Sequence, residues 1–223
     1  MFLITHSLLS SWSYLFSCQE DYQEQAEQDF MTMLRHEHKE PTPEMQNGLE
    51  FEDLCYKIAE ELYRPTVTPT GAIRAMGDTI ITEERSYHKW HTGASAVATR
   101  IKGAQFQVKA SRELSVAGMD FLVYGILDAL RAGSIFDIKF LNKSFGSAEL
   151  AGKYLDSTQH PTYFYLVPEA YEFTYLVSDG QDLYTERYTP VETKPLSVIV
   201  EQFINSIDSM GLMDVYREHW LSK

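Results

Sequence analysis

Apolar residues recur every three or four positions in several stretches of the chain, a spacing typical of helices that turn one face to a core. In the clearest stretch, Phe51, Leu54 and Ile58 follow this spacing, and the pattern stops before Pro65. Residues His36–Gly48 contain two prolines and a glycine and predict a linker in front of that helix. The predicted helices are Ser7–Leu34, Leu49–Tyr63, Tyr87–Ile101, Ser144–Ser157, Gln159–Val167, Pro195–Met210 and Leu212–Trp220.

The middle of the chain changes to the alternating pattern of strands. Three consecutive stretches predict a meander, with turns near Val116–Ala117 and Ala132–Gly133. Two later stretches predict a hairpin with Asp179–Gly180 as its turn. The five predicted strands are Gln105–Leu114, Gly118–Leu130, Ser134–Leu141, Tyr171–Ser178 and Leu183–Tyr188, while Thr66–Ile81 stays ambiguous. Helices on both sides of the strands predict one mixed α/β domain over residues 1–223.

Two acids and a lysine interrupt the second and third strands of the meander. If Ala132 and Gly133 form a two-residue loop, Asp128 lies directly across from Asp137, with Cβ atoms ~5 Å apart. Lys139 lies on the same face as Asp137, because side chains alternate along a strand. Both strands are otherwise apolar on both faces, which is typical of the middle of a sheet. Two carboxylates buried there repel each other unless one is protonated or a cation lies between them, which favours a functional site over solvated charges near a turn.

Composition and charge narrow the class of protein. The 223 residues are 44% hydrophobic and 23% charged, as in ordinary globular domains, and carry a net charge of −13. That charge argues against nonspecific nucleic-acid binding by the whole surface, but the segment Arg100–Lys153 holds eight basic and five acidic residues. Two cysteines cannot form a disulfide framework or an iron–sulfur site. No stretch has the length of a membrane helix, and Met1–Ser17 lacks the basic start of a signal peptide, so we expect a cytoplasmic protein.

Three motifs together resemble a known family. The spacing Asp128-x8-Asp137-x-Lys139 on a hairpin resembles the PD-(D/E)XK nuclease superfamily. Gly48-Leu-Glu-Phe-Glu52 resembles the helical acid element of lambda-exonuclease-like members, although many RecB-like members have His at the position of Glu52. Gln159-His-Pro-Thr-Tyr163 resembles the Gln-x3-Tyr element of RecB-like nucleases. The motifs follow the order of the family and span about half of the chain.

The resemblance implies a restriction-endonuclease-like α/β fold, with a central mixed β-sheet flanked by helices. Residues 48–167 would form the catalytic core. Residues 1–47 would be an N-terminal helical extension and linker, and residues 168–223 a C-terminal hairpin and helices.

The resemblance also implies a site. Asp128, Asp137, Glu52 and the backbone carbonyl of Ile138 would hold one or two Mg2+ or Mn2+ ions, since hard cations prefer oxygen ligands. Lys139 would position or activate the attacking water, or neutralise charge on the phosphate. Gln159 and Tyr163, one helical turn apart, would contact the phosphodiester or orient Lys139. An ordinary boundary role for Glu52 and a core role for Tyr163 stay open.

The function implied is that of a metal-dependent deoxyribonuclease, an exonuclease in recombination or replication, of the stand-alone kind common in phages. A phage-encoded protein would act in the host cytoplasm. Its partner would be DNA, with a recombination or replication protein or a second copy of the chain as further candidates. Two alternatives stay open: a structure-specific or restriction-like endonuclease, and a nuclease-fold protein that binds DNA or a protein without cleaving.

Overall fold

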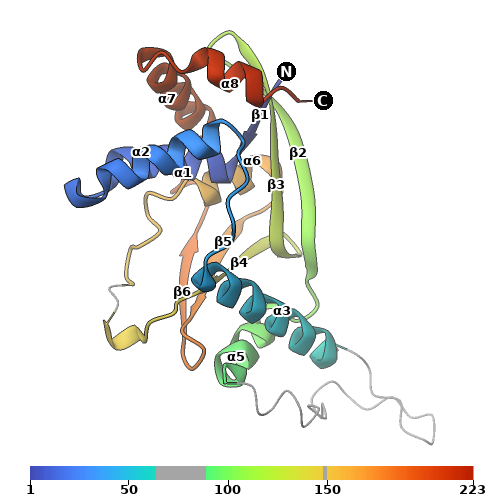
Figure 1. Cartoon of the computed structure of the whole chain (residues 1–223). Helices are drawn as coiled ribbons and strands as arrows, with labels where there is room; N and C mark the ends of the chain where they lie inside the picture. The colour runs from blue at the N-terminus through green and yellow to red at the C-terminus, as the bar shows by residue number, and fades with distance from the viewer. Residues whose placement is uncertain (64–88, 148–149, 223) are drawn as a thin grey trace, which may run out of the picture.

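A single mixed sheet organises the molecule (Figure 1). The computed structural model describes residues 1–63, 89–147 and 150–222. Within these residues the sheet has six strands in the order β1-β3-β4-β5-β6, with β2 paired to β3; β1 runs parallel to β3, β4 runs parallel to β5, and the other pairs are antiparallel. The strands are β1 (Phe2–Thr5), β2 (Gln105–Val116), β3 (Met119–Arg131), β4 (Ser134–Phe140), β5 (Glu172–Ser178) and β6 (Leu183–Tyr188).

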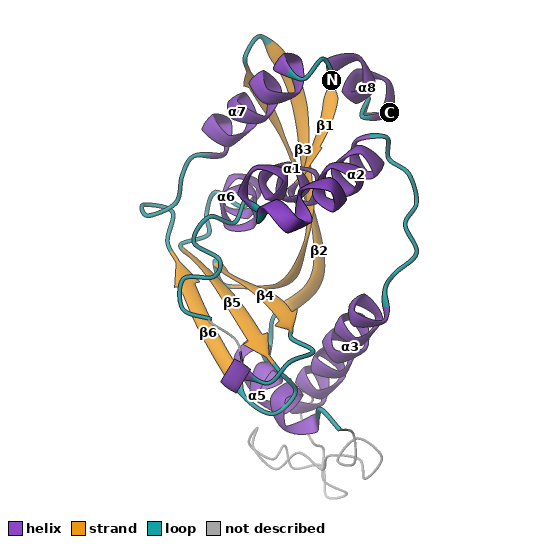
Figure 2. Cartoon of the chain, turned by 60° about the vertical axis from the view of Figure 1, so that its left-hand side comes forward, coloured by secondary structure: helices purple, strands orange, loops and turns teal. Residues whose placement is uncertain are grey.

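Helices flank the sheet in two groups, each with its own hydrophobic cluster (Figure 2). The larger cluster contains Leu8, Phe30 and Phe203, and the smaller one contains Phe51 and Val97. The larger group is α1 (His6–Ser17), α2 (Gln23–Leu34), α6 (Gln159–Leu166), α7 (Leu196–Ser209) and α8 (Met213–His219), and the smaller is α3 (Pro43–Tyr63) and α5 (His91–Ile101). The prediction of an α/β fold with a central mixed sheet flanked by helices is confirmed.

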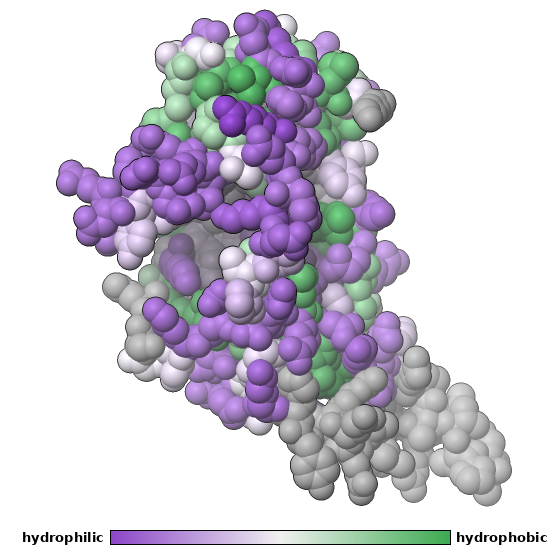
Figure 3. Space-filling view, viewed as in Figure 1, coloured by the Kyte–Doolittle hydropathy of each residue, from purple (hydrophilic) through white to green (hydrophobic). Residues whose placement is uncertain are grey.

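The two groups of helices also shape the surface. Figure 3 shows hydrophilic residues over most of one face, and a hollow between the layer of α1 and α2 and the layer of α3. Hydrophobic residues gather at the upper end of this face, in the region of α7 and α8.

The hairpin of β3 and β4 has the predicted turn. Ala132 and Gly133 form a two-residue loop with φ of 47° and 82°, the left-handed conformation that such hairpin loops use. The strands pair from Arg131↔Ser134 to Ala129↔Phe136, which is the predicted register. The turn between β2 and β3 lies at Ala117–Gly118, one residue later than predicted.

The N-terminal third differs from the sequence prediction. The predicted helix Ser7–Leu34 is two helices, because the backbone at Cys18 is extended (φ −70°, ψ 157°) and a 3-10 turn, Glu20–Tyr22, follows. A strand, β1, precedes them and was not predicted. The helix predicted from Leu49 begins at Pro43, since proline suits the first helical position and the Thr42 hydroxyl accepts the backbone N–H of Met45.

The predicted helix Ser144–Ser157 is wrong in its described part. That part contains a short 3-10 helix, Phe145–Ser147, followed by turns, and Gly152 has a φ of 73° that an α-helix does not allow. Thr66–Ile81 and the first two residues of the helix predicted over Tyr87–Ile101 lie outside the described residues. In the described parts of the chain, no helix has the length and apolar character needed to cross a membrane.

Candidate functional site

The two predicted acids lie where β3 and β4 separate. The paired ladder stops at Ala129↔Phe136, so Asp128 and Asp137 are the first residues beyond it. The backbone N–H of Ile138 points toward β3 and donates to Asp128 Oδ2 at 2.8 Å, so a side chain replaces the missing backbone partner. The N–H and C=O of one strand residue point to the same side, so the carbonyl of Ile138 also faces this gap.

Asp137 is the buried centre of the site. Its side chain is 1% exposed, and Gln159 Nε2 donates a hydrogen bond to its Oδ1. Lys139 Nζ lies 2.8 Å from Oδ2, and the Lys139 side chain is 34% exposed, so the ammonium connects the buried acid with the surface. Asp128 lies close enough that it and Asp137 shift each other's pKa. The structure therefore brings together Asp128, Asp137, Lys139 and Gln159.

Burial raises the pKa of both aspartate carboxyl groups, and repulsion by neighbouring acids adds to the shift at Asp128. Burial first, and then the charges of Asp137 and Glu52, raise the pKa of Asp128 well above its usual range. Burial raises the pKa of Asp137 against the lowering effect of Lys139. For Lys139, burial alone would lower the pKa, but the two aspartates raise it overall, so its ammonium form is stable. Without a bound cation, the aspartate pair therefore holds protons to higher pH than free carboxyl groups do.

Glu52 reaches the site from α3 but is held by other partners. Its Oε1 accepts hydrogen bonds from Tyr56 Oη at 2.5 Å and from Gln107 Nε2 at 2.6 Å. Burial raises its pKa, and the charge of Asp137 raises it further, which puts Glu52 within the electrostatic field of the pair. Direct metal coordination by Glu52 stays a prediction.

Gln107 is a component of the site that the sequence did not reveal. It lies opposite Asp128 in the β2–β3 register, between the pairs Phe106↔Ala129 and Val108↔Leu127. Its backbone has a φ of 51°, a strained conformation for a non-glycine residue, and strain of this kind clusters at functional sites.

Helix α6 supplies the two residues of the Gln-x3-Tyr motif. Tyr163 is 6% exposed, and its hydroxyl donates to the carbonyl of Ile126 at 2.8 Å, on the stretch of β3 between its β1 and β4 partners. A Cβ on Gly125 would lie 2.6 Å from the Tyr163 ring, so glycine lets the helix approach the strand this closely. Tyr163 therefore packs in the core as well as positioning β3, and contact with a phosphodiester stays a prediction.

His6 is a further residue that the sequence analysis did not select. It is the first residue of α1, and its Nδ1 lies 3.2 Å from Thr158 Oγ1. Thr158 is the residue directly before Gln159 in the chain. Burial and the positive charge of Lys139 lower its pKa to about 3, so its imidazole is neutral. No neighbouring motif marks His6 in the sequence, because β1 and α1 reach the site only through the fold.

The residues present fit a divalent cation. Asp137 Oδ2 is buried and, among the described atoms, accepts no hydrogen bond of good geometry; its charged contact is Lys139. Two carboxylates and the carbonyl of Ile138 offer hard oxygen ligands. In the described residues no group of three His, Cys, Asp or Glu side chains is already arranged to hold a metal.

Comparison with known proteins finds similarity to solved structures only. No protein-family model matches the sequence, and no curated protein matches it. Among solved structures, SSO0001 has a TM-score of 0.46 and 13% identity, with 94% of this chain and 76% of that chain covered. LHK-Exo in complex with dAMP has a TM-score of 0.45 and 12% identity, with 93% of this chain and 90% of that chain covered. At these TM-scores neither structure assigns a family or an activity to the chain.

Proposed function

We propose that this protein is a metal-dependent deoxyribonuclease of the PD-(D/E)XK type that hydrolyses phosphodiester bonds at DNA ends. The observation that carries the proposal is the paired carboxyl groups of Asp128 and Asp137 with Lys139 between them and the surface. A purely structural pair of buried acids would be costly, because burial raises the pKa of both carboxyl groups and repulsion raises that of Asp128 further.

Asp128, Asp137 and the carbonyl of Ile138 would hold Mg2+ or Mn2+. The bound ion would polarise the phosphate and lower the pKa of a water that attacks phosphorus. Gln159 holds one oxygen of Asp137, which leaves the other to turn toward a ligand. Asp128 is fixed by the N–H of Ile138, so both carboxylates are oriented before the substrate arrives.

Lys139 would act on the phosphate as a charge and a hydrogen-bond donor. Its pKa is raised by the two aspartates, so it is a poor base in the metal-free protein. Positioned at the exposed side of the pair, its ammonium would neutralise the charge that grows on the phosphate oxygens in the transition state. The basic segment Arg100–Lys153 would supply further phosphate contacts on an otherwise acidic protein.

A cleavage assay on three DNA forms tests the proposal. Linear duplex, covalently closed circular and single-stranded DNA are incubated with purified protein in Mg2+ or Mn2+, with EDTA as control. Cleavage of linear but not circular DNA supports an exonuclease, and cleavage of both supports an endonuclease. Binding without cleavage in either metal supports a non-cleaving nuclease-fold protein and contradicts the proposal.

A further inference from the structure

A cavity of about 530 Å³ is lined by Ile126, which lies two residues before Asp128 on β3, although neither aspartate lines the cavity itself. It lies beside the stretch of β3 that has neither β1 nor β4 as a partner, since β1 pairs with β3 only up to Tyr124 and β4 only from Ala129. Ile126 lines the cavity on the same face of β3 as Asp128, two residues and about 7 Å along the strand. Tyr163, which donates to the Ile126 carbonyl, lines it as well. The cavity therefore lies about two residues along β3 from the proposed reaction centre.

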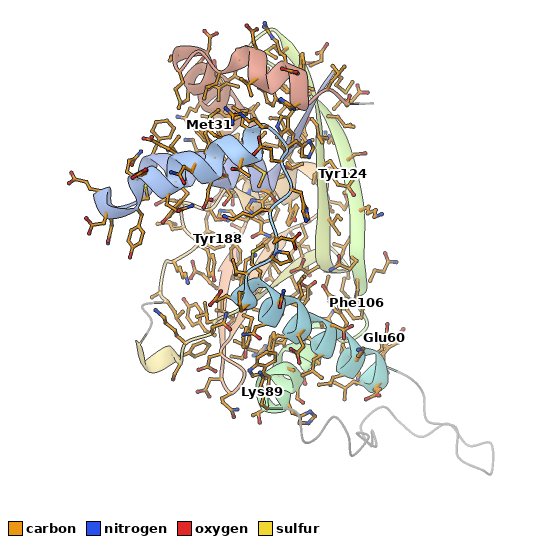
Figure 4. All side chains as sticks on the ribbon, in the orientation of Figure 1. Met31, Glu60, Lys89, Phe106, Tyr124 and Tyr188 are labelled. Atoms are coloured by element: carbon orange, nitrogen blue, oxygen red, sulfur yellow. The ribbon has the colours of Figure 1, made fainter. Side chains whose placement is uncertain are left out.

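Rings form much of its wall. Tyr124 on β3 (Figure 4) and Tyr163 line it together with the rings of His36 and Trp220. His36 and Trp220 are stacked with centroids 4.4 Å apart and an interplanar angle of 7°. His36 adopts a φ of 56°, so a strained backbone holds this exposed ring on the tryptophan. Flat aromatic surfaces that are already in place favour a flat ligand.

The lining contains no Asp, Glu, Lys or Arg side chain among the described residues. Thr5, His6 and Ser7 also line it and carry neutral hydrogen-bonding groups. A neutral aromatic cavity beside a site for a cation and a phosphate matches the two halves of a nucleotide: the uncharged base and the anionic backbone. Base–aromatic stacking is the usual way in which proteins hold unpaired bases.

We propose that this cavity binds an unpaired nucleobase of the strand whose phosphate lies at Asp128 and Asp137, an inference that rests on the proposed function. A base can enter only after it leaves its stack and its partner, at an energetic cost that is lowest in a single strand. The substrate class that follows is single-stranded DNA, or a duplex end whose terminal pairs have opened, with Tyr124 as the main stacking surface.

The test uses single-stranded ten-residue deoxyoligonucleotides that carry the fluorescent base 2-aminopurine at successive positions. With the intact protein in EDTA, where cleavage stops, we expect strong quenching at one or two positions only, because one base stacks in the cavity. Tyr124→Ala is expected to remove the quenching and weaken binding by about 5- to 150-fold, the range for loss of one base–aromatic stack. Tyr124→Phe keeps the ring and is expected to retain both the quenching and the binding affinity of the unaltered protein.

Matched controls keep the result interpretable. Tyr22→Ala removes an exposed tyrosine that does not line the cavity, and this variant is expected to bind as the unaltered protein does. If Tyr124→Ala does not fold, as judged by circular dichroism, His36→Ala replaces it, because that side chain is exposed. Uniform quenching at all positions, or unchanged affinity in Tyr124→Ala, overturns the base-binding inference.

Cleavage of unlabelled linear DNA in Mg2+, measured alongside, separates the two proposals. Cleavage without position-specific quenching overturns the base-binding cavity and leaves the nuclease proposal standing. Position-specific quenching without cleavage in any metal overturns the nuclease and leaves a protein that binds single-stranded DNA.

Discussion

The hydrogen bond from Gln159 to Asp137 makes a quantitative prediction about stability. Both side chains are buried, at 5% and 1% exposure, so solvent does not replace the bond when it is lost. Gln159→Leu removes the donor at similar side-chain volume and leaves a buried carboxylate short of a partner. A hydrogen bond to a charged group contributes about 1.5–3 kcal/mol. For a chain of this size, we expect Tm to fall by about 3–12 °C in metal-free buffer at pH 8.

A chemically matched control is available on the surface. Gln25 Nε2 donates to Asp29 Oδ1 at 3.0 Å on the solvent-facing side of α2. Gln25→Leu therefore removes the same kind of hydrogen bond where water can replace the donor. We expect it to alter the free energy of unfolding by no more than about 0.5 kcal/mol. Thermal melts followed by circular dichroism measure both variants.

A double-mutant cycle tests the cause. In an Asp137→Ala background the acceptor is absent, so Gln159→Leu should cost little or even stabilise the fold. An equal loss of Tm in both backgrounds, or no loss in the unaltered protein, would refute the assignment of this stability to the Gln159–Asp137 bond.

Three further predictions follow from the same geometry. The raised pKa of Asp128 means that the metal-free folded protein binds more protons than the unfolded chain above about pH 3.9, so its stability falls as pH rises through the folded pKa. Asp128→Asn should therefore melt higher at pH 8, and a lower Tm would contradict this. His6 has a lowered pKa of about 3, so it adds stability above pH 6.5 that is lost as the pH falls toward 3. His6→Gln should reduce the fall of Tm with decreasing pH between pH 7 and pH 4, and an unchanged dependence of Tm on pH would rule out this contribution of His6. Gly125→Ala places a Cβ 2.6 Å from the Tyr163 ring and should lower stability by about 1–3 kcal/mol in denaturant titrations, where a neutral effect would show that α6 can move away.

The chemistry of the hairpin could be predicted because it depends on local rules. A two-residue loop at Ala132–Gly133 fixes the register, and alternation along each strand then places Asp128, Asp137 and Lys139 on one side. Local rules did not predict that the β3–β4 pairing ends at Ala129↔Phe136. Asp128 accepts a hydrogen bond from the N–H of Ile138 instead of lying in a backbone pair with Asp137. Beyond this point β4 continues in parallel pairing with β5, a contact that the sequence pattern does not encode.

The remaining parts of the site come from contacts that are distant in sequence. His6 lies 152 residues from Thr158, and Gln107 lies 55 residues from Glu52. Gln107 was also hidden by the turn at Ala117–Gly118, because a turn placed one residue earlier aligns a different residue with Asp128. Tyr56, by contrast, is one helical turn from Glu52 and could have been found as its partner.

The most direct test of the central claim is the rate of DNA cleavage by the unaltered protein and by Asp137→Asn through one cycle of metal removal and return. Asn keeps the shape of the side chain and an oxygen acceptor for Gln159, but it removes the charge that would hold the cation. Linear DNA is incubated in Mn2+, EDTA is added, and excess Mn2+ is then restored. We expect cleavage by the unaltered protein to stop and resume, and Asp137→Asn to stay inactive at every stage with its fold intact. Cleavage that persists in EDTA, or an Asp137→Asn rate equal to that of the unaltered protein, would contradict a metal-dependent nuclease built on the aspartate pair.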